Sequence, residues 1–93
     1  GELIVASHSG SQIPSYAFTG RNVIWVVGVQ KIVPTLEDGL RRVREYSLPL
    51  EDERAKAMGM RGSKIGKLLI FEWEAPHLQR NLNLILVNQS LGV

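Results

Sequence analysis

The sequence predicts an α/β fold with a mostly parallel sheet and an antiparallel edge. Residues 23–27 form a continuous apolar run dominated by β-branched side chains, and Gly28 ends the run. Such a run is typical of a strand that is covered on both faces in a parallel sheet. An amphipathic helix pattern follows, and a helix that folds back over its strand is half of a β–α–β unit. We therefore expect Trp25 to lie in the middle of a layered sheet, sheltered above and below.

The chain before this strand predicts a short strand at residues 3–6, a polar loop that ends at Gln12, and a helical turn at residues 13–18. Ligands of α/β proteins bind outside the carboxyl ends of the strands, and N–H groups and hydroxyls of such a loop can donate to an anion. The loop matches neither GxGxxG nor the Walker A pattern, so a plain solvent-exposed loop is the alternative. Its candidate ligand-binding residues are Ser7, His8, Ser9, Gly10 and Ser11.

A bend at residues 28–31 joins the central strand to the helix and adds two more candidates. Gln30 and Lys31 stand close to the carboxyl end of the predicted strand, on the side where this architecture binds ligands. The alternative is that Lys31 is an exposed lysine whose stem covers the edge of the core.

The first helix is predicted to begin after Pro34, with Thr35 as its N-cap and Asp38 completing a weaker variant of the capping box. Helical spacing assigns one face to the interior and leaves the other in solvent. The interior face carries Leu36, Leu40, Val43 and Ser47, and the solvated face carries Glu37, Arg41, Arg42, Arg44 and Glu45.

Residues 47–50 contain Pro49 and are predicted to separate this helix from a second one, because proline suits the first turn of a helix but not its interior. Acidic residues 51–53 then lie in a first turn, where the helix dipole favours them. We interpret them as surface charges rather than as an acid–base pair. The second helix is predicted to end at Gly59 and to carry a narrow apolar stripe of Leu50, Arg54, Ala57 and Met58.

Two strands close the chain, at residues 67–74 and 82–87. A short loop joins them, which favours antiparallel pairing. The loop holds His77 without a second His or Cys nearby, so we predict no metal site there.

Composition excludes several classes of function. The 93 residues are predicted to form a single domain, 1–93, and a net charge of +2 is too balanced for a nucleic-acid-binding surface. No apolar run reaches about 20 residues, so no membrane span is expected. The sequence has no cysteine, which fits a cytoplasmic protein without disulfides or thiolate metal sites. The first strand begins almost at once, without an initial Met, so we expect this chain to be part of a longer protein.

A family resemblance covers nearly the whole chain. The segments GVQKIVPTLEDGLRRVREYSLPLEDERA, KLLIF and LILVNQSLGV, together with GELIVASHSGSQIPSYAFTGRNVIWVV before them, resemble the C-terminal half of the lactate-utilisation (LUD) domain of the lactate-utilisation protein C type. The resemblance implies a fragment of a three-layer α/β/α Rossmann-like domain of the ribose-phosphate isomerase and CoA-transferase-like superfamily. It also implies that the helical N-terminal part and the first strands of the domain are absent from this chain.

The resemblance further implies a cleft lined by the loop of residues 7–12 and by Gln30 and Lys31, with Glu2 as an additional ligand-binding candidate. It transfers no catalytic role to any residue. Some members act in an iron–sulfur system that oxidises L-lactate to pyruvate. Because this sequence has no cysteine, we expect no cofactor in this chain and any iron–sulfur cluster in partner subunits.

Three functions remain open from the sequence. The first is an accessory or ligand-binding subunit of an L-lactate utilisation system, which binds a small anion or partner subunits of a lactate-oxidation complex. The second is an enzyme that acts on a sugar phosphate or a CoA ester, as superfamily relatives do. The third is an inactive fragment that only self-associates as a homo-oligomer through uncovered strand edges and apolar faces.

Overall fold

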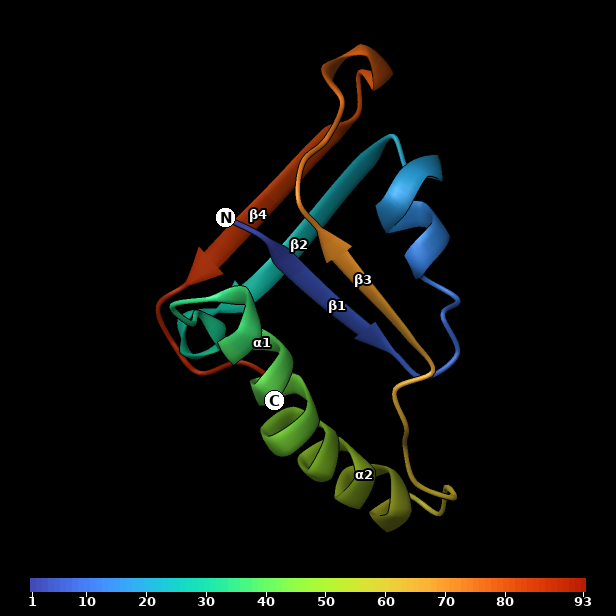
Figure 1. The fold of residues 1–93 in the computed structure, drawn as a ribbon. Coiled ribbons are helices and arrows are strands. Elements are labelled where there is room, and N and C mark those ends of the chain that lie inside the picture. The colour runs from blue at the N-terminus through green and yellow to red at the C-terminus, as the bar shows by residue number, and fades with distance from the viewer.

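The structure is a computed structural model that describes all residues of the chain, Gly1–Val93 (Figure 1). Its strands are β1 (Leu3–Ser7), β2 (Asn22–Gly28), β3 (Lys67–Phe71) and β4 (Asn81–Val87), and its α-helices are α1 (Leu36–Arg42) and α2 (Leu48–Ala57). Short helical turns are η1 (Ser15–Thr19), η2 (Val29–Lys31), η3 (Val43–Ser47) and η4 (Pro76–Leu78). The predicted α/β class is confirmed.

The strands form two separate two-stranded sheets rather than the single mixed sheet that was predicted. β1 and β3 pair antiparallel, with Leu3 opposite Phe71, whereas β2 and β4 pair in parallel, with Asn22 opposite Asn81. In Figure 1 the first pair runs across the second. The predicted antiparallel pairing of the last two strands is therefore wrong. Residues 72–80 return the chain to the start of β2, where the Asn81 N–H donates to the Arg21 carbonyl at 2.7 Å, so β4 runs in the direction of β2.

Strand β2 is covered on one face only. Val23 is 6% exposed, but Ile24 and Val26, which alternate with it along the strand, are 62% and 57% exposed. The prediction that this strand is sheltered above and below is therefore wrong. On the uncovered face, Ile85 of β4 stands opposite Val26 and is 48% exposed, because nothing in this chain packs over that side of the pair.

The covered face of β2 is closed by aromatic contacts. The ring of Trp25 meets Tyr16 of η1 edge-on at a centroid distance of 5.5 Å and meets Phe71 of β3 at 5.8 Å. Such edge-to-face pairs add to the burial of apolar area. This cluster joins the two sheets and the first helical turn into one body.

The helical region is continuous from α1 through η3 into α2, so the predicted separation at residues 47–50 is wrong. The predicted cap is confirmed, because the Thr35 side chain accepts a hydrogen bond from the Asp38 N–H at 3.1 Å. Pro49 has no N–H and its ring excludes a regular α-helical turn before it. The chain inserts a π-helical turn instead, in which the Leu48 N–H donates to the Val43 carbonyl.

The apolar stripe predicted for α2 is wrong. Ala55 is the buried residue at 3% exposure, whereas Met58 is 61% exposed. The inward face of α2 is small and polar because a connector packs there, and the Asp52 carboxylate accepts from the Ser63 N–H at 2.7 Å. The helix ends at Ala57 with Met58 as its C-cap, and Gly59, the residue predicted to end it, follows in the left-handed conformation with φ of 83°.

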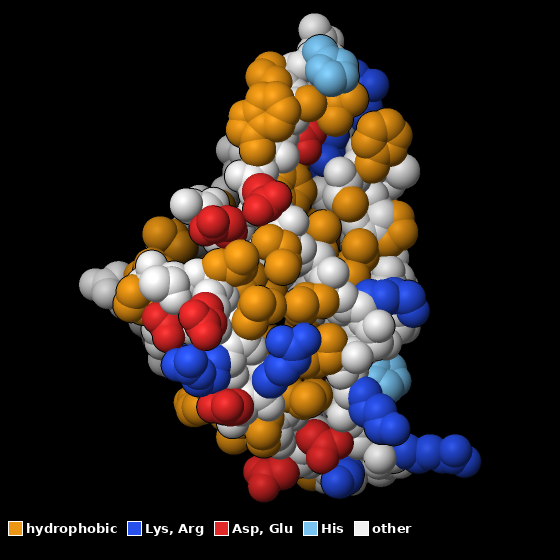
Figure 2. Space-filling view, viewed as in Figure 1, with side chains coloured by type: hydrophobic (Ala, Val, Ile, Leu, Met, Phe, Trp, Pro, Cys, Tyr) orange, Lys and Arg blue, Asp and Glu red, His pale blue; other side chains and the backbone are white.

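The interior of the molecule is small. Only five residues are buried, and no large side chain is fully buried. α1 reaches β1 through Gly39, where a Cβ would lie 2.6 Å from Cδ1 of Ile4. Figure 2 shows charged side chains over the helices and hydrophobic side chains across the middle of the same face. None of the helices combines the length and the hydropathy that crossing a membrane requires.

Candidate functional site

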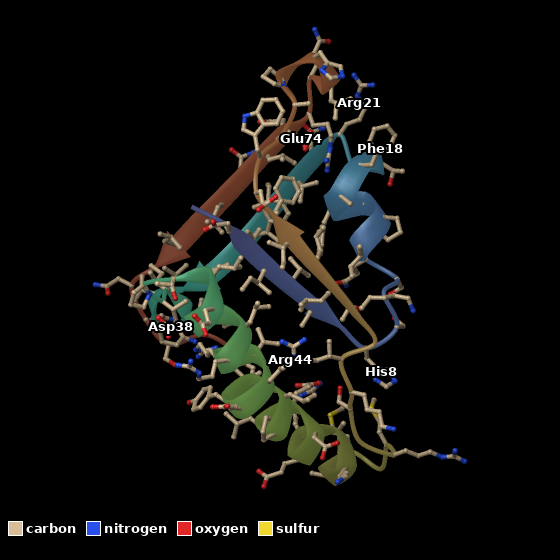
Figure 3. All side chains as sticks on the ribbon, viewed as in Figure 1. His8, Phe18, Arg21, Asp38, Arg44 and Glu74 are labelled. Carbon is tan, nitrogen blue, oxygen red and sulfur yellow. The ribbon has the colours of Figure 1, made fainter.

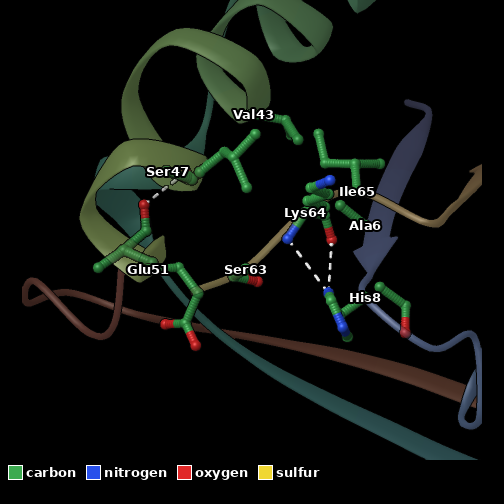
Figure 4. Close-up of a pocket in the computed structure, with 11 residues that line it drawn as sticks. Ala6, His8, Val43, Ser47, Glu51, Ser63, Lys64 and Ile65 are labelled. Atoms are coloured by element: carbon green, nitrogen blue, oxygen red, sulfur yellow. Dashed lines mark hydrogen bonds between the residues drawn. The ribbon is translucent and has the colours of Figure 1, made fainter. Parts of the chain in front are cut away.

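A cavity of about 350 Å³ lies between the helical region and the carboxyl end of β1 (Figure 4). One wall is helical and carries Ser47 and Glu51. The opposite wall is formed by the end of β1, with His8, and by the connector, with Lys64. Val93, the last residue of the sequence, also lines the cavity. This cavity therefore collects residues from four distant parts of the sequence.

The predicted loop after β1 places Ser7 and His8 at the cavity, but two of its own N–H groups are used within the loop. The Gly10 N–H donates to Oγ of Ser7 at 2.8 Å, and the Ser11 N–H donates to Oγ of Ser9 at 3.2 Å. The loop is thus built as a self-bonded turn, and these two N–H groups are not directed at a ligand.

Lys67 of β3 holds the same loop from outside. Its ammonium donates to the Ser9 carbonyl at 3.0 Å, and its stem lies where a Cβ of residue 10 would be. Gly10 has a φ of 85°, a conformation that glycine adopts at low cost. Glycine is therefore required at this position by backbone conformation and by packing.

His8 is fixed to the connector by one ring nitrogen. Nδ1 lies 3.1 Å from the Lys64 nitrogen and 3.2 Å from the Lys64 carbonyl oxygen, so it can accept from the first or donate to the second (Figure 4). Either protonation state of Nδ1 keeps the imidazole against the Lys64 main chain. The ring is exposed, and Nε2 has no hydrogen-bond partner in the structure.

Gln30, Lys31 and Glu2 do not line this cavity. Nε2 of Gln30 donates to the Leu91 carbonyl at 2.7 Å. Lys31 in η2 lies beside Gly92, so both residues contact the C-terminal segment. Glu2 is exposed and lies 3.7 Å from the N-terminal ammonium.

The single cleft expected from the resemblance is divided in this structure because β1 and β2 belong to different sheets. Their carboxyl ends therefore do not share one edge. Figure 3 shows His8 and Asp38, at the start of α1, on opposite sides of the molecule. A ligand role for Glu2, Gln30 and Lys31 remains a prediction.

Arg42 was not among the predicted site residues, because helical spacing assigned it to the solvated face. Nη1 of Arg42 donates to Oγ of Ser47 at 2.9 Å and to the main-chain oxygen of Val93 at 2.8 Å. The Ser47 hydroxyl also donates to the Val93 oxygen, at 2.7 Å. The signal that was available is Pro49, since a proline inside a continuous helix changes which preceding residues share a face.

The acidic residues of α2 act as surface charges. Hydrogen bonds from the Arg54 side chain hold the pKa of Glu51 below its usual value. The Ser63 N–H, with the Lys56 side chain second, lowers the pKa of Asp52. Both carboxylates are therefore ionised at neutral pH. The structure also brings together no group of three or more His, Asp or Glu side chains that could hold a metal ion.

Comparison with known proteins gives one match. A family model of the LUD domain matches residues 1–64, which include β1, β2 and the whole helical region. No curated protein and no solved structure matches the chain. The matched residues contain the helical wall of the cavity and the loop after β1, and strands β3 and β4 lie beyond the match. The chain therefore belongs to the LUD domain family, which connects it in general terms with lactate utilisation.

Proposed function

We propose that this chain is a ligand-binding, accessory part of a cytoplasmic L-lactate utilisation system, of the lactate-utilisation protein C type, and that it binds a small organic-acid anion. The observation that carries this proposal is the cavity, in which hydroxyl groups stand between aliphatic walls in a LUD family chain, and where the Arg42 guanidinium bonds the lining residue Ser47. In this proposal residues 1–93 are the C-terminal portion of a larger Rossmann-like LUD domain.

The cavity suits a small ligand in size and chemistry. A volume of about 350 Å³ lies at the lower end of the range for small-molecule sites. Val43, Leu48 and Ile65 supply apolar surface, and Ser7 and Ser47 supply hydroxyls. A few polar groups on a mainly apolar wall are typical of sites that orient a small organic molecule.

The proposed system includes an iron–sulfur component, and this chain does not fit such a cluster. Clusters of this kind are held by cysteine thiolates, and the sequence has no cysteine. The proposal therefore assigns cluster and electron transfer to partner subunits of a lactate-oxidation complex and assigns ligand binding to this chain.

Titration of the full chain with pyruvate, L-lactate, inorganic phosphate and CoA, followed by methyl NMR, tests the proposal. We expect pyruvate or L-lactate to shift the methyl signals of Val43, Leu48 and Ile65 in a saturable way. The methyls of Ile24 and Val26 on the uncovered face of β2 are the internal control and stay unchanged. Saturable shifts with phosphate or CoA alone would support the enzyme on sugar phosphates or CoA esters instead.

A second candidate function, self-association, is favoured by the uncovered face of the β2–β4 pair. Ile24, Val26 and Ile85 stand together there and are each about half exposed or more. Contiguous exposed apolar surface marks interaction sites. If this face joins two copies of the chain, light scattering will report a dimer, and Val26→Lys will convert it to a monomer. A monomeric wild-type chain would rule this candidate out.

A further inference from the structure

We propose that Arg42 and Ser47 form the seat for the carboxylate of the ligand, and that the C-terminal segment occupies this seat when no ligand is bound. This inference rests on the proposed function and names the residues and the ligand class of the same cavity. The main-chain oxygen of Val93 stands where a carboxylate oxygen would bind. It accepts from Nη1 of Arg42 at 2.8 Å and from the Ser47 hydroxyl at 2.7 Å.

The π-helical turn brings the two donors together. In a regular α-helix of 3.6 residues per turn, side chains five positions apart point about 140° away from each other. η3 is wound with i→i+5 hydrogen bonds, so Arg42 and Ser47 share one face and lie 2.9 Å apart. Pro49 keeps the turn in this form because it prevents a regular turn before it. Such turns are frequent at functional sites.

Arg42 is held in position and is not neutralised. None of the ion pairs in the structure involves Arg42. By contrast, its neighbour Arg41 on the same helix is paired with Glu37 and Asp38. The Arg42 guanidinium lies over the Tyr46 ring at 4.8 Å, which orients the group without cancelling its charge. The guanidinium is part-buried and has no side-chain carboxylate as a partner, and a charge-assisted bond to a ligand carboxylate is stronger than a bond to a carbonyl.

The other walls favour a small monocarboxylate over a phosphate. Val43, Leu48 and Ile65 border the same cavity and fit a short aliphatic body. Glu51 also lines it, and the low pKa that Arg54 gives this carboxyl keeps it negatively charged. A dianionic phosphate would meet that charge, which Arg54 offsets only in part, and would need both Arg42 and Lys64 as counter-charges, whereas a monoanion such as pyruvate needs one cation.

The C-terminal segment is then a competitor for the seat. Two sets of contacts hold it: Gln30 bonds Leu91, and Arg42 with Ser47 bonds Val93. Residues 88–93 lie outside any helix or strand. Binding of a carboxylate would release the second set and leave the first, so the segment would pivot about Leu91. Gln30, at the end of β2, would therefore control the affinity without touching the ligand.

The test is a calorimetric titration of the full chain with pyruvate in the wild type and four variants. We expect Arg42→Gln to weaken binding about 10-fold or more and Ser47→Ala to weaken it by a few-fold. Arg44→Gln removes an exposed arginine of the same turn, without side-chain bonds in the structure, and leaves the affinity within about two-fold. Gln30→Leu loosens the segment and strengthens binding by a few-fold. Circular dichroism of each variant checks that it is folded. If Arg42→Gln is not folded, Arg42→Lys replaces it in the titration.

A second readout follows the competitor directly. In the wild type, saturation with pyruvate should shift the Val93 signals. The side-chain amide signals of Gln30, which donates to the Leu91 carbonyl, should stay unchanged. Equal pyruvate affinity in the wild type and Arg42→Gln, or phosphate binding as tight as pyruvate, would overturn this inference alone. Absence of any monocarboxylate binding in the wild type would overturn it together with the proposed function.

Discussion

Two part-buried arginines at different places in the molecule show that the same type of side chain can serve two purposes. Arg80, before β4, is 4% exposed and saturates its donors: they bond the carbonyls of residues 15, 16, 17 and 20 and the Glu74 carboxylate. Arg42 bonds the Ser47 hydroxyl and the Val93 main-chain oxygen, which belong to the cavity lining, and it has no side-chain carboxylate partner. Both are set in place by residues distant in the sequence.

The difference separates a structural arginine from a ligand-ready one. The carbonyls that Arg80 bonds belong to the π-helical turn η1 and to Gly20 directly after it; the last carbonyls of a helical turn lack partners within it, although the Ser15 carbonyl also accepts from the Gly20 N–H. Arg80 therefore replaces water at a helix end and joins η1 to the start of β4. Arg42 bonds only through Nη1, and its partner Val93 lies in a segment outside any helix or strand. A change at Arg42 should therefore affect ligand binding more than stability.

The largest expected effect is the loss of Arg80. Arg80→Met leaves Glu74 without its partner and removes the side-chain donor of four carbonyls, of which the Ser15 carbonyl keeps the Gly20 N–H, so the free energy of unfolding should fall by about 3 kcal/mol. Urea denaturation of the two proteins measures it. Arg21→Met, at an exposed arginine near the same end, is the control and should change stability by less than about 0.5 kcal/mol. Equal effects of the two substitutions would remove the distinction between structural and surface arginines.

The next effect concerns the loop at the cavity. Gly10→Ala should cost about 2 kcal/mol, because it adds backbone strain at a φ of 85° and displaces the Lys67 stem. Gly59→Ala has a similar φ of 83° in open space and should cost only the strain, about 1 kcal/mol. Thermal unfolding compares the two. If Gly59→Ala costs as much as Gly10→Ala, the packing of Lys67 on the loop contributes nothing.

A smaller change in stability, with a clear change in binding, is expected for Pro49→Ala. Alanine permits a regular α-helical turn, so stability should change by less than about 1 kcal/mol while Arg42 and Ser47 rotate apart. Pyruvate affinity should fall by several-fold in calorimetry. Pro34→Ala, before the helix, is the matched control and should bind as the wild type does. Unchanged affinity in Pro49→Ala would show that the π-helical turn does not position the seat.

The smallest effect is a pH dependence at the connector. The Ser63 N–H and Lys56 lower the pKa of Asp52 below its ordinary value of 3.8, so its contribution to stability is complete above that value. The contribution is lost as the pH falls through the lower pKa of the folded state. The urea midpoint of Asp52→Asn should therefore lie below that of the wild type at pH 6, and the two should converge below pH 3.8. A gap that is independent of pH would contradict this.

Local signals predicted the elements well and their contacts poorly. The strand around Trp25, the Thr35 cap and the left-handed Gly59 after the second helix each depend on neighbouring residues and are found, whereas the predicted cover on both faces of the strand is not. Pairing of β4 with β2 depends on where residues 72–80 lead the chain, which no pattern in the strands records. The residues of the predicted cleft lie apart for the same reason, since they follow strands in different sheets, and their role as ligand-binding residues stays a prediction.

By itself the sequence determined the α/β class, the order of the elements and membership of the LUD domain family, because propensity, capping and family motifs are properties of short segments. Only the tertiary structure decided which strands pair, which face of β2 is covered, and that Arg42, Ser47 and Val93 meet at one cavity. These outcomes depend on contacts between residues far apart in the chain. Such contacts form only where burial and hydrogen bonding of all the elements are satisfied together.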